Sequence, residues 1–370
     1  MTELIAPPAT HETPLTRFLA SNSATPPELV SWSGVLTPLR LDAPDAETGA
    51  LLSGAAIHDL GWIRRISVRG EDRVRWLSGM VTNDVETLPD RRGAYNLILN
   101  AQGRIQGDAV VWRDGDTLEL ELITAQSETL LAHLDRFIIM DDVELAPITG
   151  QSALGLTGPR AEEVLSKVGL RALPDLLSTT QGSVEGIPVR LDRGYGALVP
   201  HYALWAAEEQ IPSLWKALVS AGASPVGAAS LETLRIVEGI PVYGVDIQSR
   251  DLPQETSLTR ALSFSKGCYL GQEIVERIRS RGQVHRHLRA LELFPQSTEL
   301  PSAGAELRPA NAAPDTKAAG NLTSVTELLW NGVRRIFALA MIRAEAEISS
   351  QPLTYDGGPA QILSSTPKGI

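Results

Sequence analysis

The first candidate for chemistry is the only cysteine of the chain, Cys268, which lies in the segment Lys-Gly-Cys-Tyr-Leu-Gly-Gln-Glu at 266–273. A turn with two glycines, Gly267 and Gly271, lets the backbone bend sharply or approach another group closely. A short helix is predicted over 272–279, so the sulfur precedes a positive helix terminus, and Lys266 lies two residues before it. Both features favour the thiolate, and the spacing therefore predicts a reactive cysteine.

The residues around Cys268 have assigned roles in this interpretation. Tyr269 packs or donates a hydrogen bond nearby, and Gln272 and Glu273 cap the predicted helix. The alternative to a reactive thiol is that Cys268 is a small buried hydrophobic residue, as a lone cysteine most often is. A disulfide within the chain, a CxxC redox pair and a cysteine-based zinc cluster are all excluded, because there is no second cysteine.

Three other groups of polar residues could line a site. Asp108 follows a glycine-containing turn at 100–104, and Arg235 lies in a charged row on a predicted helix over 228–238. A basic cluster lies between residues 277 and 289, and arginine forks suit the carboxylates or phosphates of a small anionic ligand. Taken alone, each group is better explained by a solvated surface or an ion-pair ladder than by a ligand site. The sequence contains no P-loop, GxSxG or HExxH motif, and its histidines show no metal-ligand spacing.

The elements that must position these residues alternate between strands and helices. Strands are predicted over 62–68, 94–100, 105–112 and 117–123, with helices over 71–80 and 126–137. A similar order recurs after residue 151, and strand-like segments with many turn residues follow residue 285. The sequence predicts an α+β protein. We expect a loosely structured tail at 1–40, a first α+β domain at 41–150, a second at 151–284 that includes the cysteine segment, and a β-barrel at 285–370.

The composition is that of a soluble globular protein, with 43% hydrophobic and 21% charged residues. The net charge of -11 argues against direct nucleic-acid binding through a broad basic face. No apolar run is long enough to span a membrane, and the N-terminus lacks the pattern of a signal peptide. A single cysteine agrees with a reducing environment, so a cytoplasmic location is expected.

The segment at 266–273 resembles the KGCYxGQE signature of the YgfZ family, a branch of the glycine-cleavage T-protein superfamily. Further matches occur in the family's order, and they are the segments at 81–85 (Val-Thr-Asn-Asp-Val), 94–104, 155–159 (Gly-Leu-Thr-Gly-Pro), and 231–244. The likeness runs from about residue 57 to the C-terminus. It implies two related α+β domains and a C-terminal barrel, arranged as a cloverleaf around a central cavity.

The implied ligand in that cavity is tetrahydrofolate or a one-carbon derivative. By this resemblance Tyr95, Asp108, Arg235 and Tyr269 would lie near the folate, and Trp62 would offer an aromatic wall. Cys268 would lie at the rim of the cavity. The implied partners are iron–sulfur proteins or radical enzymes, because YgfZ proteins support the assembly or repair of iron–sulfur clusters and, through it, tRNA modification. The role of the cysteine stays open among persulfide carrier, transient cluster ligand and one-carbon acceptor.

The departures from the T-protein pattern bear on catalysis. T-proteins show an Asp-Asp pair where this chain has Gly107-Asp108, and a Gly-Tyr-Thr-Gly-Glu run where it has no glutamate at 193–198. A site that transfers an aminomethyl group needs carboxylates to hold the pterin and manage a proton. The leading hypothesis is therefore a folate-binding protein that works through Cys268. The alternatives are a folate-dependent aminomethyl- or methyltransferase and a non-catalytic folate-binding module.

Overall fold

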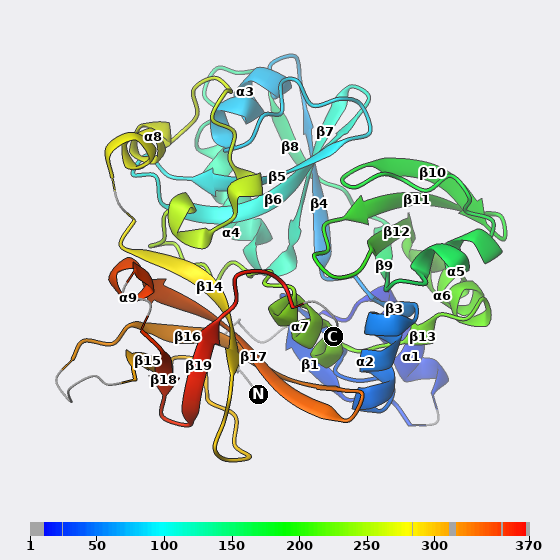
Figure 1. The fold of residues 1–370 in the computed structure, drawn as a ribbon. Coiled ribbons are helices and arrows are strands. Elements are labelled where there is room, and N and C mark those ends of the chain that lie inside the picture. The colour runs from blue at the N-terminus through cyan, green and yellow to red at the C-terminus, as the bar shows by residue number, and fades with distance from the viewer. Residues whose placement is uncertain (1–10, 24, 283, 311–315, 349–350, 368–370) are drawn as a thin grey trace.

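The chain folds into three parts that meet at a common centre (Figure 1). The structure is a computed structural model and describes residues 11–23, 25–282, 284–310, 316–348 and 351–367. The predicted mixed fold of two α+β parts and a barrel is confirmed: two antiparallel-rich sheets carry helices, and a third set of strands closes into a barrel.

The first sheet has five antiparallel strands in the order β5-β6-β7-β4-β8. Its strands are β4 (Ile63–Arg69), β5 (Gly93–Leu99), β6 (Ile105–Asp114), β7 (Thr117–Ile123) and β8 (Glu144–Pro147). Helices α3 (Arg73–Met80) and α4 (Thr124–Asp135) belong to this part. Its core is an apolar cluster that includes Leu77 of α3, Val111 of β6 and Leu134 of α4, so alternate residues of the strands face the helices.

The second sheet has six strands in the order β10-β11-β12-β9-β3-β13. Its strands are β3 (Ala56–Asp59), β9 (Gln151–Thr157), β10 (Thr179–Val184), β11 (Ile187–Gly194), β12 (His201–Ala207) and β13 (Ser224–Pro225). The helices of this part are α2 (Pro44–Ser53), α5 (Ala161–Lys167), α6 (Ile211–Ser220) and α7 (Ala228–Val237). Helix α7 also contacts the barrel strand β16, which places it at the centre of the molecule.

The barrel closes in the order β14-β17-β16-β15-β18-β19. Its strands are β14 (Arg286–Leu293), β15 (Glu306–Pro309), β16 (Gly320–Trp330), β17 (Val333–Arg343), β18 (Leu353–Tyr355) and β19 (Gly358–Ile362), and α9 (Ala344–Ile348) follows β17. An apolar cluster with Leu97 of β5, Ile236 of α7 and Phe337 of β17 joins all three parts.

The expectation of a loose tail at 1–40 differs from the structure for residues 11–40. Helix α1 (Pro14–Asn22) and the hairpin of β1 (Leu29–Trp32) and β2 (Val35–Pro38) lie here, and Leu15 is completely buried. The physical reason is a buried carboxylate: the side chain of Asp59 accepts hydrogen bonds from the hydroxyls of Thr13, Thr16 and Thr37. The segment is therefore tied to the second sheet. Residues 1–10 lie outside the described residues.

The structure also divides the middle of the chain differently from the expected boundaries. Strand β3 lies within the expected first domain at 41–150, but it pairs with β9 and β13 in the second sheet. The cysteine segment was expected in the second domain, but it contacts the first part, because the Leu270 amide donates to the Gly79 carbonyl at 2.9 Å. Along the part of the chain that the structure describes, no helix is long and apolar enough to cross a membrane.

Candidate functional site

Tyr95 and Asp108 form a hydrogen-bonded pair on neighbouring strands. In the β5–β6 ladder Tyr95 pairs with Val110 and Leu97 pairs with Asp108, so Tyr95 and Asp108 are diagonal neighbours on one face of the sheet, within reach of a long aromatic side chain. The Tyr95 hydroxyl donates to Asp108 Oδ2 at 2.6 Å. The sequence-predicted site residues Tyr95 and Asp108 are therefore brought together.

Gln126, from the first turn of α4, completes this pair. Its Nε2 donates to Asp108 Oδ1 at 2.9 Å, and its Oε1 accepts from the Asp108 amide at 3.2 Å. A Cβ atom at Gly107 would lie only 2.8 Å from the same Oε1. The position of the missing second carboxylate is therefore closed by Gln126, which sequence reasoning did not single out.

Burial sets the protonation behaviour of this cluster. Desolvation raises the pKa of Asp108, and the hydrogen bonds from Tyr95 and Gln126 oppose that rise. Desolvation also raises the pKa of Tyr95 well above its usual value, and the negative charge of Asp108 adds to the effect. Tyr243 lies close enough for Asp108 to contribute to the raised pKa of its phenol, after the larger effect of burial. The cluster can thus accept and donate hydrogen bonds at one polar edge.

Arg260 links the Tyr95–Asp108 cluster to the second part of the molecule. Its guanidinium carbon lies 5.2 Å from the ring centroid of Tyr95 and 4.1 Å from that of Tyr195. Tyr195 follows β11 of the second sheet, whereas Tyr95 belongs to the first sheet. The positive charge of Arg260 also acts to lower the pKa values of both Tyr95 and Asp108. No sequence motif marks Arg260, so its place could be found only from the tertiary structure.

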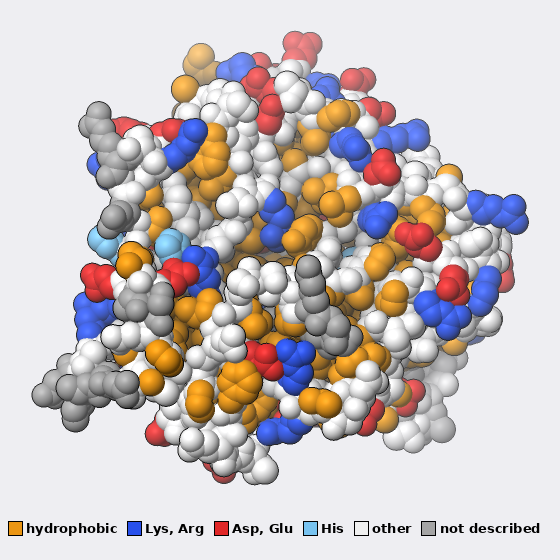
Figure 2. Space-filling model, viewed as in Figure 1, with side chains coloured by type: hydrophobic (Ala, Val, Ile, Leu, Met, Phe, Trp, Pro, Cys, Tyr) orange, Lys and Arg blue, Asp and Glu red, His pale blue; other side chains and the backbone are white. Residues whose placement is uncertain are grey.

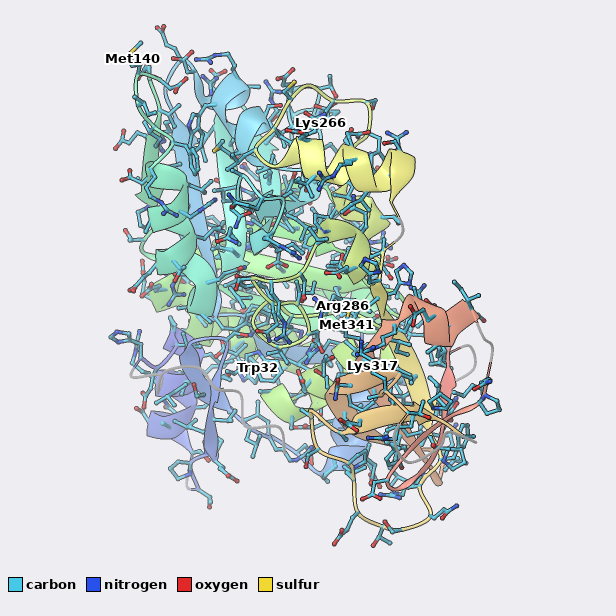
Figure 3. The ribbon with its side chains drawn as sticks, turned by 90° about the vertical axis from the view of Figure 1, so that its left-hand side faces the viewer. Trp32, Met140, Lys266, Arg286, Lys317 and Met341 are labelled. Atoms are coloured by element: carbon cyan, nitrogen blue, oxygen red, sulfur yellow. The ribbon has the colours of Figure 1, made fainter. Side chains whose placement is uncertain are left out.

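Cys268 is an exposed free thiol, and its segment leads into α8 (Gln272–Arg281) at the outer edge of the molecule (Figures 1 and 3). The buried alternative for this cysteine therefore does not apply. Among the described residues, no hydrogen bond joins Cys268 to Tyr95 or Asp108. The structure thus separates the predicted site into a polar cluster and an exposed cysteine segment.

Lys266 holds the cysteine segment on the first part. Its Nζ donates to the carbonyl oxygens of Ser78, Val81 and Asn83, at 2.7, 2.7 and 2.9 Å. These carbonyls lie at and beyond the C-terminus of α3, where a cation is favourable. Burial lowers the pKa of Lys266 to about 8, so it remains an ammonium with three donors at neutral pH. Its hydrogen bonds go to the backbone, and the predicted activation of the thiol by Lys266 stays a prediction.

The two glycines of the segment differ. Gly271 has a φ of 80° and a Cβ there would lie 2.5 Å from the Asn100 carbonyl oxygen, whereas Gly267 has open space around it. Gln272 accepts a hydrogen bond from the Tyr269 amide at 3.3 Å, and Glu273 lies in the first turn of α8. The turn therefore depends on Gly271.

Tyr269 faces the centre rather than solvent. It is 7% exposed, packs in the apolar cluster shared by the three parts, and its hydroxyl has no hydrogen-bond partner among the described residues. Burial raises the pKa of Tyr269 to about 12. Its ring lies 5.1 Å from Lys266 Nζ, so Tyr269 connects the cysteine segment to the central cluster.

Arg235 forms hydrogen bonds within the protein, and these differ from its predicted contact with folate. Its guanidinium donates to the Glu232 carboxylate through two nitrogens, to Asp246 and the Ile240 carbonyl, and to Ser324 of β16. An arginine has five N–H donors, and all five are used. Arg235 is buried and clamps α7 to the barrel, which leaves no donor for a ligand in this arrangement.

Trp62 lies on the side of the N-terminal hairpin. Its indole N–H donates to the Asp59 carbonyl at 3.1 Å, and its ring packs edge-on against Trp32 at 6.5 Å between centroids. Figure 3 shows Trp32 well below Lys266 in that view. The structure therefore groups Trp62 with Trp32, and no hydrogen bond or ring contact joins Trp62 to the Tyr95–Asp108 pair among the described residues.

A second polar chain runs through the second sheet. His58 Nδ1 lies 3.2 Å from the Asp59 carbonyl, and its Nε2 lies 3.0 Å from the Thr157 hydroxyl. Because a carbonyl only accepts, Nδ1 carries the hydrogen and Nε2 accepts from Thr157. Burial lowers the pKa of His58 to about 4. Further along, His201 Nε2 lies 3.0 Å from Glu238 at the end of α7, so this chain links the second sheet to the centre.

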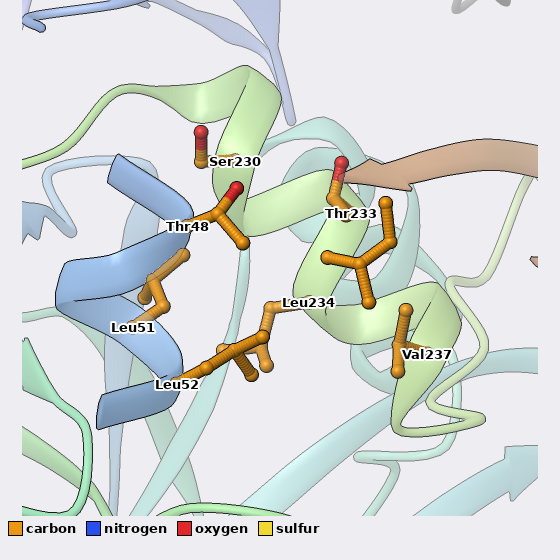
Figure 4. Close-up of a pocket in the computed structure, with 8 residues that line it drawn as sticks. Thr48, Leu51, Leu52, Ser230, Thr233, Leu234 and Val237 are labelled. Atoms are coloured by element: carbon orange, nitrogen blue, oxygen red, sulfur yellow. The ribbon is translucent and has the colours of Figure 1, made fainter. Parts of the chain in front are cut away.

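Two cavities lie away from the polar cluster, a small void and a cleft on the barrel. A cavity of about 10 Å³ lies between α2 and α7, lined by the residues drawn in Figure 4, and it has room for a water molecule at most. A cleft of about 460 Å³ lies on the barrel, with Phe294, Glu347 and Ile362 among its lining residues. The space-filling view shows hydrophobic side chains gathered in a hollow where the three parts meet (Figure 2). No group of three metal-ligating side chains suited to an ion occurs in the described ranges.

The architecture defines a class: three-part proteins with the aminomethyltransferase fold. The structure is similar to the glycine cleavage system aminomethyltransferase T of Bartonella henselae, with a TM-score of 0.81, 19% identity, and coverage of 96% of this chain and 97% of that one. At this level of identity the likeness establishes the fold.

The family follows from the sequence comparisons. Residues 30–266 match the GCVT N-terminal domain, and the chain belongs to this family. It is 30% identical to an aminomethyltransferase of Rubrobacter xylanophilus over 261 residues, which cover 69% of each protein. It is 28% identical to a putative chloroplastic transferase of Arabidopsis thaliana over 347 residues, which cover 91% of this chain and 76% of that protein.

Proposed function

We propose that this protein binds a reduced folate at the Tyr95–Asp108–Gln126 cluster and acts, through Cys268, in support of iron–sulfur proteins, as the YgfZ branch of the superfamily does. The observation that carries folate binding is the desolvated carboxyl of Asp108, held by Tyr95 and Gln126 beside aromatic rings and the central apolar cluster. A pterin has flat apolar faces and a polar edge, and such ligands bind where a few fixed polar groups interrupt an apolar surface.

In this proposal the chain's own residues do the following. Asp108 hydrogen-bonds the polar edge of the ligand, Tyr95 and Gln126 fix the orientation of its carboxyl, and the apolar cluster excludes water. A bound reduced folate would supply one-carbon chemistry. A single carboxylate, with Gly107 closed by Gln126, favours binding over aminomethyl transfer.

The second candidate function is a folate-dependent aminomethyl- or methyltransferase. The names of the relatives favour it, since several are aminomethyltransferases. It predicts turnover of a methylamine donor with tetrahydrofolate. Purified protein that binds folate but shows no such turnover would remove this candidate. Folate binding that supports no partner and is indifferent to thiol alkylation would indicate a plain binding module.

The folate proposal is tested by anaerobic calorimetric titration of tetrahydrofolate into the wild-type protein and two variants. Asp108→Asn should weaken binding about tenfold or more, because a charge-assisted hydrogen bond contributes roughly 1.5–3 kcal/mol. The control is Asp116→Asn in the exposed hairpin turn that follows β6, which should bind like wild type. Equal affinity for all three proteins would contradict the assignment of Asp108.

The role of Cys268 is tested separately. In cells that lack the endogenous protein, Cys268→Ala should fold, bind tetrahydrofolate normally and fail to restore the activity of iron–sulfur enzymes. Ser265→Ala is the control, because it lies three residues away on the same exposed segment. Full restoration by Cys268→Ala would refute the thiol's role and leave folate binding intact.

A further inference from the structure

Arg260 is an ordered cation whose guanidinium has no hydrogen-bond acceptor among the described residues. Its side chain is half-buried and stacks with Tyr195 at 4.1 Å and Tyr95 at 5.2 Å. Arg235 is the instructive contrast, because protein acceptors take all five of its N–H donors. The N–H donors of Arg235 are thus all used within the protein, whereas those of Arg260 remain available to a ligand.

The backbone around Arg260 is fixed rather than loose. Asn83 Nδ2 donates to the Arg260 carbonyl at 2.9 Å and to the Tyr95 carbonyl at 3.1 Å. A single amide therefore holds the arginine and one of its stacking tyrosines in register. The flanking residues Thr259 and Ala261 form a short 3-10 helix with it. Stacking of a guanidinium on aromatic faces orders its plane and leaves its edge free to donate.

The guanidinium of Arg260 lies close to the proposed ligand site, beside the ring of Tyr95. Its charge acts on both Asp108 and Tyr95, yet it forms no hydrogen bond with Asp108 among the described residues. The cluster therefore offers a fixed cation and a separate polar edge. A ligand that uses both must carry an anionic group next to a neutral, hydrogen-bonding part.

We infer that Arg260 binds a carboxylate of the ligand. This inference rests on the proposed folate function and deepens it. The planar fork of a guanidinium matches the two oxygens of a carboxylate, and the pairing is bidentate and charge-assisted. The carboxylate has two sources: the glutamyl part of the folate itself, or a separate small substrate that binds beside the pterin. In either case Arg260 decides which ligands the site accepts.

The test measures binding of three probes by anaerobic calorimetry: tetrahydrofolate, tetrahydrobiopterin, which has no carboxylate, and glycine added to the tetrahydrobiopterin complex. The proteins are wild type, Arg260→Gln, Arg260→Lys, and Lys216→Gln as the matched control. Lys216 is also a cation stacked on a ring, 5.1 Å from Phe18, but it lies on α6 at the outside. Unchanged thermal unfolding midpoints will show that the variants are folded.

If the folate supplies the carboxylate, Arg260→Gln should weaken tetrahydrofolate at least tenfold and leave tetrahydrobiopterin within twofold of wild type. Arg260→Lys should recover part of the loss, since it keeps the charge but not the fork. If a separate substrate supplies it, glycine should bind the wild-type complex with tetrahydrobiopterin and not the Arg260→Gln complex. Lys216→Gln should match wild type in both arms.

Two results would overturn the inference, and they can be told apart. Tetrahydrofolate that binds wild type and Arg260→Gln equally, without any glycine binding, would remove the role of Arg260 and leave the folate function standing. Tetrahydrofolate that does not bind the wild-type protein at all would remove the proposed function, and the carboxylate role of Arg260 with it.

Discussion

Gly271 and Gly103 lie in direct backbone contact, where the cysteine segment meets the β5–β6 turn. A Cβ at Gly271 would lie 2.9 Å from the Gly103 Cα, and a Cβ at Gly103 would lie 2.8 Å from the Ile274 side chain. Both residues have positive φ, 80° and 69°. The contact docks the start of α8 onto the same hairpin that carries Tyr95 and Asp108, so the cysteine segment and the polar cluster share one rigid support.

Gly271→Ala should therefore destabilise the protein, whereas Gly267→Ala should not. The first substitution adds a Cβ at positive φ against backbone atoms, which costs about 1–3 kcal/mol. The second adds a methyl group in open space at a φ outside the left-handed region. Thermal unfolding measures the difference, and the reaction rate of Cys268 with a thiol reagent reports the position of the segment. Similar unfolding midpoints for the two variants would contradict the docking role of Gly271.

Lys266→Met should loosen the cysteine segment. It removes three charge-assisted hydrogen bonds to the carbonyls of Ser78, Val81 and Asn83. We expect a loss of about 2–3 kcal/mol in the free energy of unfolding, and faster hydrogen exchange over 266–273. Lys167→Met is the control, because its exposed Nζ donates one hydrogen bond among the described residues, to the Ala221 carbonyl. A Lys266→Met protein as stable as the control would show that these bonds are not needed.

Arg235→Gln should be among the most damaging single substitutions in the centre. It leaves Asp246 and Glu232 without their cation, and breaking a buried ion pair costs about 3–5 kcal/mol. Arg279→Gln on the exposed face of α8 removes a surface pair and should cost less than about 1 kcal/mol. Chemical denaturation measures both. A stable Arg235→Gln protein with weakened folate binding would instead support a ligand contact for Arg235.

His58 should make the protein less stable in mild acid. Its pKa is about 4 in the folded state, against 6.5 for an ordinary histidine, so the unfolded chain binds a proton more readily. Its contribution is present above pH 6.5 and is lost as pH falls from 6.5 to 4, up to about 3 kcal/mol.

The measurement is urea unfolding of wild type and His58→Gln between pH 7 and pH 4. The variant should show a shallower loss of stability over this window, because glutamine does not titrate. The neighbouring Asp59, whose pKa is raised by burial, contributes with the opposite sign in both proteins and cancels in the comparison. Parallel curves for the two proteins would contradict the neutral, buried state of His58.

Local patterns of the sequence determined the secondary structure of the parts that carry the site. The strands at 94–100 and 105–112 were predicted within a residue or two, and so were α7 and α8. Gly271 before the helix was also readable, because a turn that needs positive φ is a local property. The lone thiol and the absence of catalytic motifs were likewise fixed by the chain itself.

The tertiary structure alone decided which side chains share a surface. The sequence pattern marks Arg235 and not Arg260. In the structure, however, Ser324 and Asp246 accept hydrogen bonds from Arg235, whereas Tyr195 and Tyr95 stack on Arg260. The N-terminal segment had weak periodicity, yet three threonines bind the buried Asp59 carboxylate and order it. Hydrogen-bond partners that lie tens to hundreds of residues apart leave no local pattern, so only the folded chain assigns them.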